Sequence, residues 1–221
     1  MDIISNYTNR INNTGINHSF KGQRVLSLWA RRQFGQKVSP IPLAVTKLSI
    51  EEDKKLMQAL LPVWVDQTTY GGKIIPAFLS QKIDDKRKLN LFIGFFRDEF
   101  YMLENPIEKD PLKRIKALLM LNNYRKFFFI NFIQSASELS SKRQFDGGGS
   151  ILLYALVKLA KKLKKNSVEL TSTVDTWYDR LGFCVPGCGK FYFPVLGDTV
   201  LKKRDFPETI KFVEKHYDLM F

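Results

Sequence analysis

Three consecutive glycines stand directly before the most strongly amphipathic segment of the chain. In RQFDGGGSILLYALVKLAKKLKK, leucines recur at helical spacing after Gly147, Gly148 and Gly149, and lysines crowd the last turn. Glycine is a poor helix former, so three together indicate that the backbone itself is needed where this helix begins. Free amides at a helix start, supported by the helix dipole, bind phosphate groups. The structural alternative is a flexible glycine loop before a helix.

Two common phosphate-binding loops do not fit these glycines. A Walker loop needs Lys and then Ser or Thr directly after its last glycine, whereas Ser150 follows Gly149 and the next lysine is Lys158. A dinucleotide-binding fingerprint needs a further glycine where Leu152 stands. The pattern that remains is Gln-x-x-Gly-x-Gly between a strand and a long helix, with the amides of residues 145–150 able to converge on a pyrophosphate.

A second motif follows after one helix, one strand and one short helix. It is TSTVDTWYDRLGF, in which Tyr178 stands four residues before Gly182. Together the two motifs, within residues 132–196, resemble the core of the GCN5-related N-acetyltransferase (GNAT) superfamily. The resemblance implies that the glycine loop holds the pyrophosphate of coenzyme A and that the Tyr178 hydroxyl faces the thioester sulfur. The sequence departs from the family pattern at Thr171 and Val174, which concerns contacts near the pantetheine.

The resemblance also implies the residues that contact the cofactor, whereas the family's catalytic glutamate aligns with Ile133 and cannot be carried over. The backbone of Ser137 and Leu139 would pair with the pantetheine amides, and the loop contacts would come from Gln144, Phe145, Asp146, Gly147, Gly148, Gly149 and Ser150. Tyr178 would donate a proton to the departing thiolate, because a phenol of pKa about 10 is protonated at neutral pH. A packed aromatic is the alternative role for Tyr178. Glu138 is the first candidate for a general base, Glu169 and Glu99 are the runners-up, and water alone is a further alternative.

The order of elements predicts an α/β or α+β protein with a mixed sheet, and the resemblance implies a mostly antiparallel sheet flanked by helices. Expected strands are PIPLAVTKLS, LNLFIGFFRD, EFYMLENPI, RKFFFINFI, SVELTST and the hairpin FCVPGCGKFYFPVL. Expected helices are QRVLSLWARRQFG, SIEEDKKLMQALLPVW, DPLKRIKALLMLNN, SILLYALVKLAKKLKK, VDTWYDRLG and TIKFVEKHYDLMF. Residues 1–40 are interpreted as an N-terminal arm with a short helix, and residues 41–221 as an acetyltransferase-like domain.

The net charge of +13 biases the chain toward anionic partners. The lysines that end the long helix lie away from the expected phosphates and indicate a surface for something else. The leading function is acetyl-CoA-dependent N-acetyl transfer to a primary amine, and the charge slightly favours a protein or an aminoacyl-tRNA as acceptor. The alternative is a module without turnover that binds nucleic acid or a protein through its basic surface. An effector or toxin is a third class that the composition allows.

Cysteine and histidine are scarce, which bears on metals and redox state. Cys184 and Cys188 flank a Pro-Gly turn, and His18 and His216 lie near opposite ends. No structural zinc quartet can be assembled from them without carboxylates, so no metal is expected. Free thiols are favoured over a small disulfide. The absence of a signal peptide or a membrane-spanning run predicts a cytoplasmic protein, although signal-independent secretion stays open. The oligomeric state is open, a dimer included.

Overall fold

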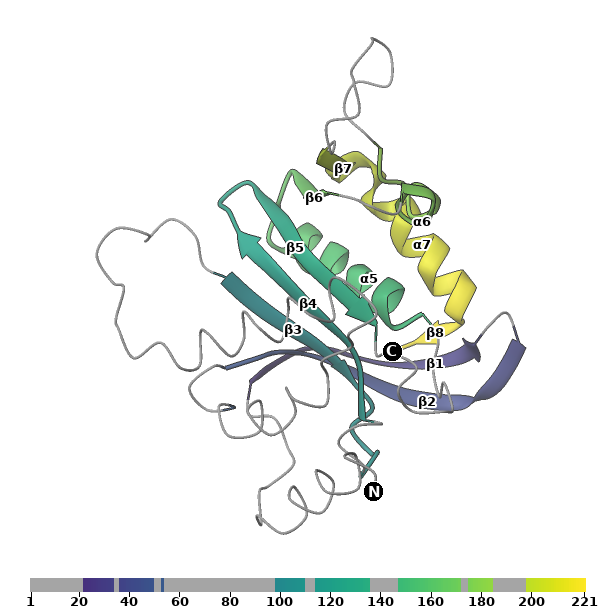
Figure 1. Ribbon diagram of the computed structural model, residues 1–221. Coiled ribbons are helices and arrows are strands. Elements are labelled where there is room, and N and C mark those ends of the chain that lie inside the picture. The colour runs from purple at the N-terminus through teal and green to yellow at the C-terminus, as the bar shows by residue number, and fades with distance from the viewer. Residues whose placement is uncertain are drawn as a thin grey trace, which may run out of the picture.

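The structure is a computed structural model that describes residues 22–33, 36–49, 53, 98–109, 114–135, 147–171, 175–184 and 198–221. Its strands form one eight-stranded sheet in the order β7-β6-β5-β4-β3-β2-β1-β8 (Figure 1). The strands are β1 Gln23–Gln33, β2 Gln36–Lys47, β3 Asp98–Glu104, β4 Ile115–Asn123, β5 Phe127–Ser135, β6 Ser167–Thr171, β7 Asp198–Lys202 and β8 Leu219–Met220. The helices are α5 Gly148–Lys162, α6 Asp175–Arg180 and α7 Phe206–Tyr217, with a short 3-10 turn, η1 Lys203–Asp205.

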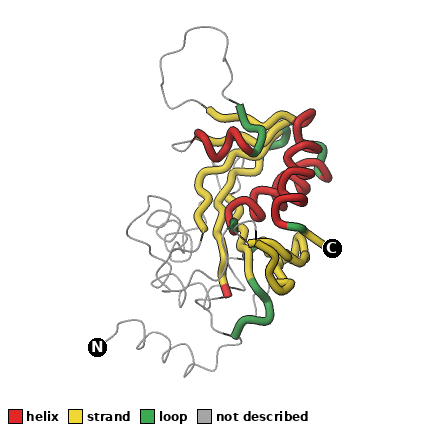
Figure 2. The backbone as a smooth tube through the Cα atoms, turned by 90° about the vertical axis from the view of Figure 1, so that its right-hand side faces the viewer, coloured by secondary structure: helices red, strands yellow, loops and turns green. Residues whose placement is uncertain are grey.

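The sheet is mixed and mostly antiparallel, as predicted. β5 and β6 pair in parallel, and every other neighbouring pair is antiparallel. A parallel pair needs a crossover connection, and α5 lies in the connection between β5 and β6. α5 contacts β3, β4, β5 and α7, so both helices pack on one face of the sheet (Figure 1, Figure 2).

Helix α5 forms the centre of the hydrophobic core. Its residues from Gly148 to Val157 are all buried, because the sheet covers one side of the helix and α7 contacts it as well. Fully burying a leucine such as Leu152 or Leu153 contributes about 1.5–3 kcal/mol of stability. The basic residues Lys161 and Lys162 end the helix in solvent, where the helix dipole favours cations.

Two expected helices are strands, and both predictions were wrong for a physical reason. In DPLKRIKALLMLNN the structure has β4, in which Ile115 to Leu121 are all buried. A strand covered on both faces is a continuous apolar run, which periodicity does not separate from a helix. QRVLSLWARRQFG is β1, where exposed Ser27, Trp29 and Arg31 alternate with buried Leu28 and Ala30. That two-residue period is the pattern of a half-buried strand.

Several other expectations have definite outcomes. The strands PIPLAVTKLS, EFYMLENPI, RKFFFINFI and SVELTST, and helices α5, α6 and α7, are confirmed.

The chain end was expected to be helical, but Leu219 and Met220 form β8 and pair with Ala30 and Trp29. Strand β7 was not expected. The helix in SIEEDKKLMQALLPVW, the strand LNLFIGFFRD and most of FCVPGCGKFYFPVL lie outside the described residues. The division expected at residue 40 falls inside β2, and residues 23–33 and 36–40 lie in strands of the sheet.

Candidate active site

The two parallel strands pair only over part of their lengths. β5 pairs with β6 from Phe127 to Ile130, and β5 then continues to Ser135 along β4, where Ser135 lies opposite Ala117. α5 begins after β5 and α6 begins after β6, so both helix starts lie beyond the carboxyl ends of these strands (Figure 1). In sheets with parallel strands, this position beyond the strand ends is where ligands commonly bind.

The start of α5 presents backbone donors at this place. Gly147 has φ 94°, and its carbonyl oxygen accepts the hydrogen bond of the Ile151 amide at 3.0 Å. The Gly149 amide donates to Ser135 Oγ at 3.0 Å. The backbone amides of the first helical turn have no acceptor within the helix. The amides of Gly148 and Ser150 are therefore hydrogen-bond donors that make no intrahelical bond. The first turn carries no acidic residue that would repel an anion.

The glycines also have a packing role that sequence reasoning missed. A Cβ on Gly147 would lie 2.3 Å from the Tyr217 ring of α7, and one on Gly148 would lie 2.6 Å from the Lys116 carbonyl oxygen of β4. Both distances are too short for any side chain. Gly149 is less confined, with Ser135 Oγ at 3.2 Å and the Trp177 ring at 3.7 Å from a built Cβ. Glycine at positions 147 and 148 therefore lets the start of α5 pack closely against α7 and β4. This packing role is independent of phosphate binding.

Tyr178 lies on α6 and is buried, with 9% of its surface exposed. Its ring packs edge-on against Trp177 at 4.5 Å and against Phe183 at 5.6 Å between ring centroids. Burial raises the pKa of Tyr178 to about 12, so its hydroxyl keeps its proton well above neutral pH. Among the described residues the structure gives this hydroxyl no hydrogen-bond partner. Trp177 contacts both Tyr178 and the start of α5, so the fold brings the two sequence motifs together.

The other predicted site residues have different outcomes. Ser150 is buried in the first turn of α5, beside the glycines. Residues Ser137, Glu138, Leu139, Gln144, Phe145 and Asp146 lie outside the described residues, so their roles stay predictions. Ser135 and Trp177 were not expected at the site. The only sequence signal for Ser135 is the run of small residues that follows β5, and for Trp177 its place beside Tyr178.

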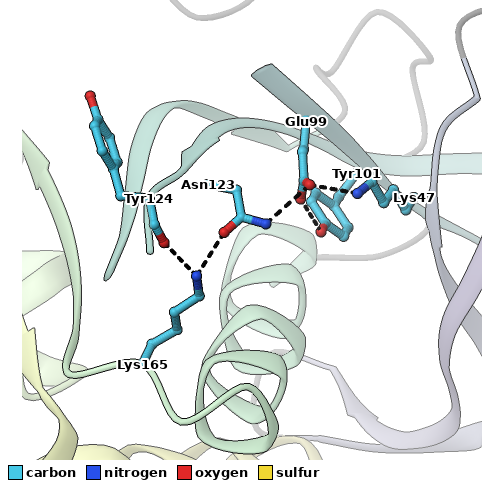
Figure 3. A network of polar contacts seen from close by, with 6 residues as sticks. All are labelled: Lys47, Glu99, Tyr101, Asn123, Tyr124 and Lys165. Carbon is cyan, nitrogen blue, oxygen red and sulfur yellow. Dashed lines mark hydrogen bonds and ion pairs between the residues drawn. The ribbon is translucent and has the colours of Figure 1, made fainter. Parts of the chain in front are cut away.

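The two alternative bases have structural partners. Glu169 accepts a hydrogen bond from Ser167 Oγ at 2.5 Å. Glu99 is the second residue of β3 and pairs with Leu121, at the other end of β4 from Ala117 and the candidate site. It accepts hydrogen bonds from Lys47 Nζ at 2.6 Å, the Tyr101 hydroxyl at 2.7 Å and Asn123 Nδ2 at 3.1 Å (Figure 3). Burial alone would raise the pKa of Glu99, but these hydrogen bonds outweigh it and lower the pKa.

The lowered pKa of Glu99 predicts an acid-dependent contribution to stability. Because its pKa is lower in the folded protein, the ionised carboxylate stabilises the fold above about pH 4, and this stabilisation is lost as the pH falls through the lowered value. Glu99→Gln is therefore expected to cost about 1–3 kcal/mol at neutral pH. Urea unfolding of both proteins from pH 7 downward measures the difference, which should shrink on acidification. A cost independent of pH would contradict this role.

The described residues show neither a metal site nor a membrane span. No group of His, Cys, Asp and Glu among them could hold a metal ion. None of the described helices has the length and apolar character needed to cross a membrane. Cys184 is an exposed free thiol, whereas Cys188 lies outside the described residues.

No protein-family model and no curated protein matches the sequence. Solved structures do match. GCN5 of Tetrahymena is 14% identical over 66% of this chain and 85% of that chain, with a TM-score of 0.41. The N-acetyltransferase PseH of Campylobacter jejuni is 15% identical over 73% and 98%, with a TM-score of 0.42. The PaiA N-acetyltransferase of Thermoplasma acidophilum, in complex with coenzyme A, is 17% identical over 72% and 98%, with a TM-score of 0.43.

Two of these three solved structures, PseH and PaiA, are N-acetyltransferases by name. The described residues of this chain form one mixed sheet with helices packed against it.

Proposed function

We propose that the protein is an acetyl-CoA-dependent N-acetyltransferase that transfers the acetyl group to a primary amine by direct attack on the thioester. The observation that carries the proposal is the meeting of two groups where β5 and β6 part. One is the start of α5 with its backbone donors, and the other is the short helix α6, which carries the buried Tyr178. Trp177 packs against Tyr178 and lies beside Gly149 of α5, which supports one shared site for a donor to an anion and a donor to a leaving group.

The residues at the helix start suit a pyrophosphate. The amides of Gly148 and Ser150 point out of the first turn of α5, and the positive end of the helix dipole lies there with no carboxylate in that turn. Ser135 holds the neighbouring Gly149 amide and thereby ties the helix start to the end of β5. The proposed contacts of Gln144, Phe145 and Asp146 would complete this loop, and the backbone of Ser137 and Leu139 would hold the pantetheine.

Acetyl transfer then needs a general acid that protonates the departing thiolate sulfur and a base that takes the proton of the acceptor amine. Acetyl-CoA would supply an activated acetyl group as its thioester. As the C–N bond forms and the C–S bond breaks, Tyr178 gives its hydroxyl proton to the sulfur, which a phenol that stays protonated at neutral pH can do. The amine loses its proton to Glu138 or to water. We propose a protein amine or an aminoacyl-tRNA as acceptor, since the chain carries a net charge of +13.

Calorimetric titration with acetyl-CoA, followed by an assay of thiol release against a set of amine acceptors, tests the proposal. Saturable binding and thiol release that depends on the amine are expected. ATP serves as a control, because a chain of charge +13 attracts any polyanion. Equal affinities for ATP and acetyl-CoA would show that the binding is nonspecific electrostatic attraction of a polyanion. Specific binding of acetyl-CoA without thiol release would leave only the binding-module alternative.

A further inference from the structure

Three segments meet at the end of the sheet away from the start of α5: the turn between β4 and β5, the connection from α5 to β6, and the passage from β7 into η1 (Figure 1). The Asn166 amide donates to the Lys126 carbonyl oxygen at 2.6 Å, and the Lys203 amide donates to the Asn166 carbonyl oxygen at 2.8 Å. Asn166 therefore links all three segments through its backbone.

These segments gather exposed basic side chains, which we call the basic end. It consists of Arg125, Lys126, Lys161, Lys162, Lys164, Lys202, Lys203 and Arg204, all exposed. Within residues 124–126, 161–166 and 202–205 the only acidic residue is Asp205, which pairs with Arg204 at 3.5 Å. The electrostatic potentials of neighbouring like charges add, so the basic end is a region of strong positive potential.

A buried lysine holds the basic end together. Lys165 is only 6% exposed, and its Nζ donates to Asn123 Oδ1 at 2.8 Å and to the carbonyl oxygens of Tyr124 and Arg125. Figure 3 shows the side chain of Lys165 pointing toward Asn123 and the Tyr124 carbonyl, and the network continuing from Asn123 to Glu99. Lys165 thus fastens the β4–β5 turn to the end of α5 and fixes Arg125 beside the helix lysines.

The end of α5 gives a second, independent observation. The Lys165 amide donates to the Ala160 carbonyl oxygen and the Lys164 amide to that of Lys161, which is the Schellman pattern of helix termination. In this pattern the residue with positive φ is commonly glycine, yet here it is Lys164, with φ 55°. A long basic side chain therefore occupies a position where its own backbone conformation is unfavourable.

From these observations we infer that the basic end is a binding surface for the phosphate backbone of a nucleic acid. Clustered Lys and Arg bind phosphates and release the counterions of the nucleic acid. Protein interfaces, in contrast, have an apolar centre and are depleted in lysine, and Leu163 is the only exposed large hydrophobic residue of the described segments named above. α5 separates this surface from the proposed cofactor site by about 20 Å, so the inference holds whether or not the chain transfers acetyl groups.

The test is fluorescence anisotropy with a labelled single-stranded RNA of about twenty nucleotides, titrated at several salt concentrations. The variant Lys126→Gln/Lys161→Gln/Lys162→Gln/Lys203→Gln removes four charges from the basic end. Its matched control, Arg31→Gln/Lys37→Gln/Lys211→Gln/Lys215→Gln, removes four exposed charges from β1, β2 and α7. We expect the first variant to raise the Kd at least about tenfold and to flatten the slope of log K against log salt by up to about 3. The control should change the Kd by less than about threefold.

The variant Lys164→Gly distinguishes the loss of a basic charge from a loss of stability, because it removes the charge without destabilising the fold. Glycine relieves the positive φ of this position, so the Tm should rise by about 2–4 °C, while the RNA affinity falls. Saturating acetyl-CoA should leave the RNA affinity unchanged, because the two sites are distinct. Four results would overturn the inference: no RNA binding by the wild type, an equal loss in the control variant, displacement of RNA by acetyl-CoA, or tighter binding to polyglutamate or to phosphatidylserine vesicles than to RNA.

Discussion

Tyr178→Phe is expected to lower the turnover of acetyl-CoA by a factor of about 10²–10⁴, the usual range for the loss of a general acid. The affinity for acetyl-CoA should stay within about threefold of the wild type, since the ring remains packed and the backbone donors of α5 are unchanged. Steady-state kinetics of thiol release together with calorimetric binding measure the two quantities. Unchanged turnover would show that Tyr178 is a packed aromatic without a chemical role.

Tyr154→Phe is the matched control for this substitution. Tyr154 is also buried, but its hydroxyl donates to Glu214 Oε1 at 2.7 Å and accepts from Lys158 Nζ at 3.1 Å, between α5 and α7. Loss of these hydrogen bonds should cost about 1–3 kcal/mol of stability and leave turnover unchanged. Tyr178→Phe should have the opposite profile, because its hydroxyl has no partner among the described residues.

The raised pKa of Tyr178 adds a pH dependence to the same prediction. A general acid must carry its proton, and burial raises the pKa of this hydroxyl to about 12. Its deprotonation therefore removes activity only above about pH 11, whereas an ordinary tyrosine would begin to do so near its usual pKa of about 10. The rate profile for an acceptor amine that is neutral throughout this range measures the difference. A fall centred near pH 10 that is absent from Tyr178→Phe would contradict the burial of this hydroxyl.

Gly147→Ala is expected to destabilise the protein by roughly 3–5 kcal/mol, from positive backbone φ and overpacking together. The added Cβ would lie 2.3 Å from the Tyr217 ring, and φ at this position is 94°. Urea unfolding measures the loss. Because the fold itself suffers, loss of coenzyme binding in this variant would not identify a phosphate site.

Gly182→Ala provides the comparison for the steric part. Gly182 also has positive φ, 83°, but the nearest atom to a built Cβ is Thr209 Oγ1 at 3.3 Å. This variant should therefore cost only about 1–2 kcal/mol, which is the backbone contribution alone. Equal losses at positions 147 and 182 would show that α7 gives way and that the close approach of Tyr217 does not require glycine.

The two motifs of the candidate site can be found in the sequence because each motif is local. Glycines before a long amphipathic helix and a tyrosine before Gly182 are visible in the chain, and the structure brings them together through Trp177. The contact of Ser135 with Gly149 joins residues on different elements, and no local pattern contains it. The packing of Tyr217 against Gly147 was missed for the same reason.

The sequence by itself determined the strand–helix–strand centre of this protein, from β5 through α5 to β6, and the short helix that carries Tyr178. Helical periodicity and glycine preferences are properties of neighbouring residues, so they can be read along the chain. Only the tertiary structure decided that residues 115–123 form a strand, that the chain end pairs with β1, and that Lys165 joins the β4–β5 turn to α5. These features depend on which distant segments bury one another, and burial between distant segments leaves no periodic signal in either of them.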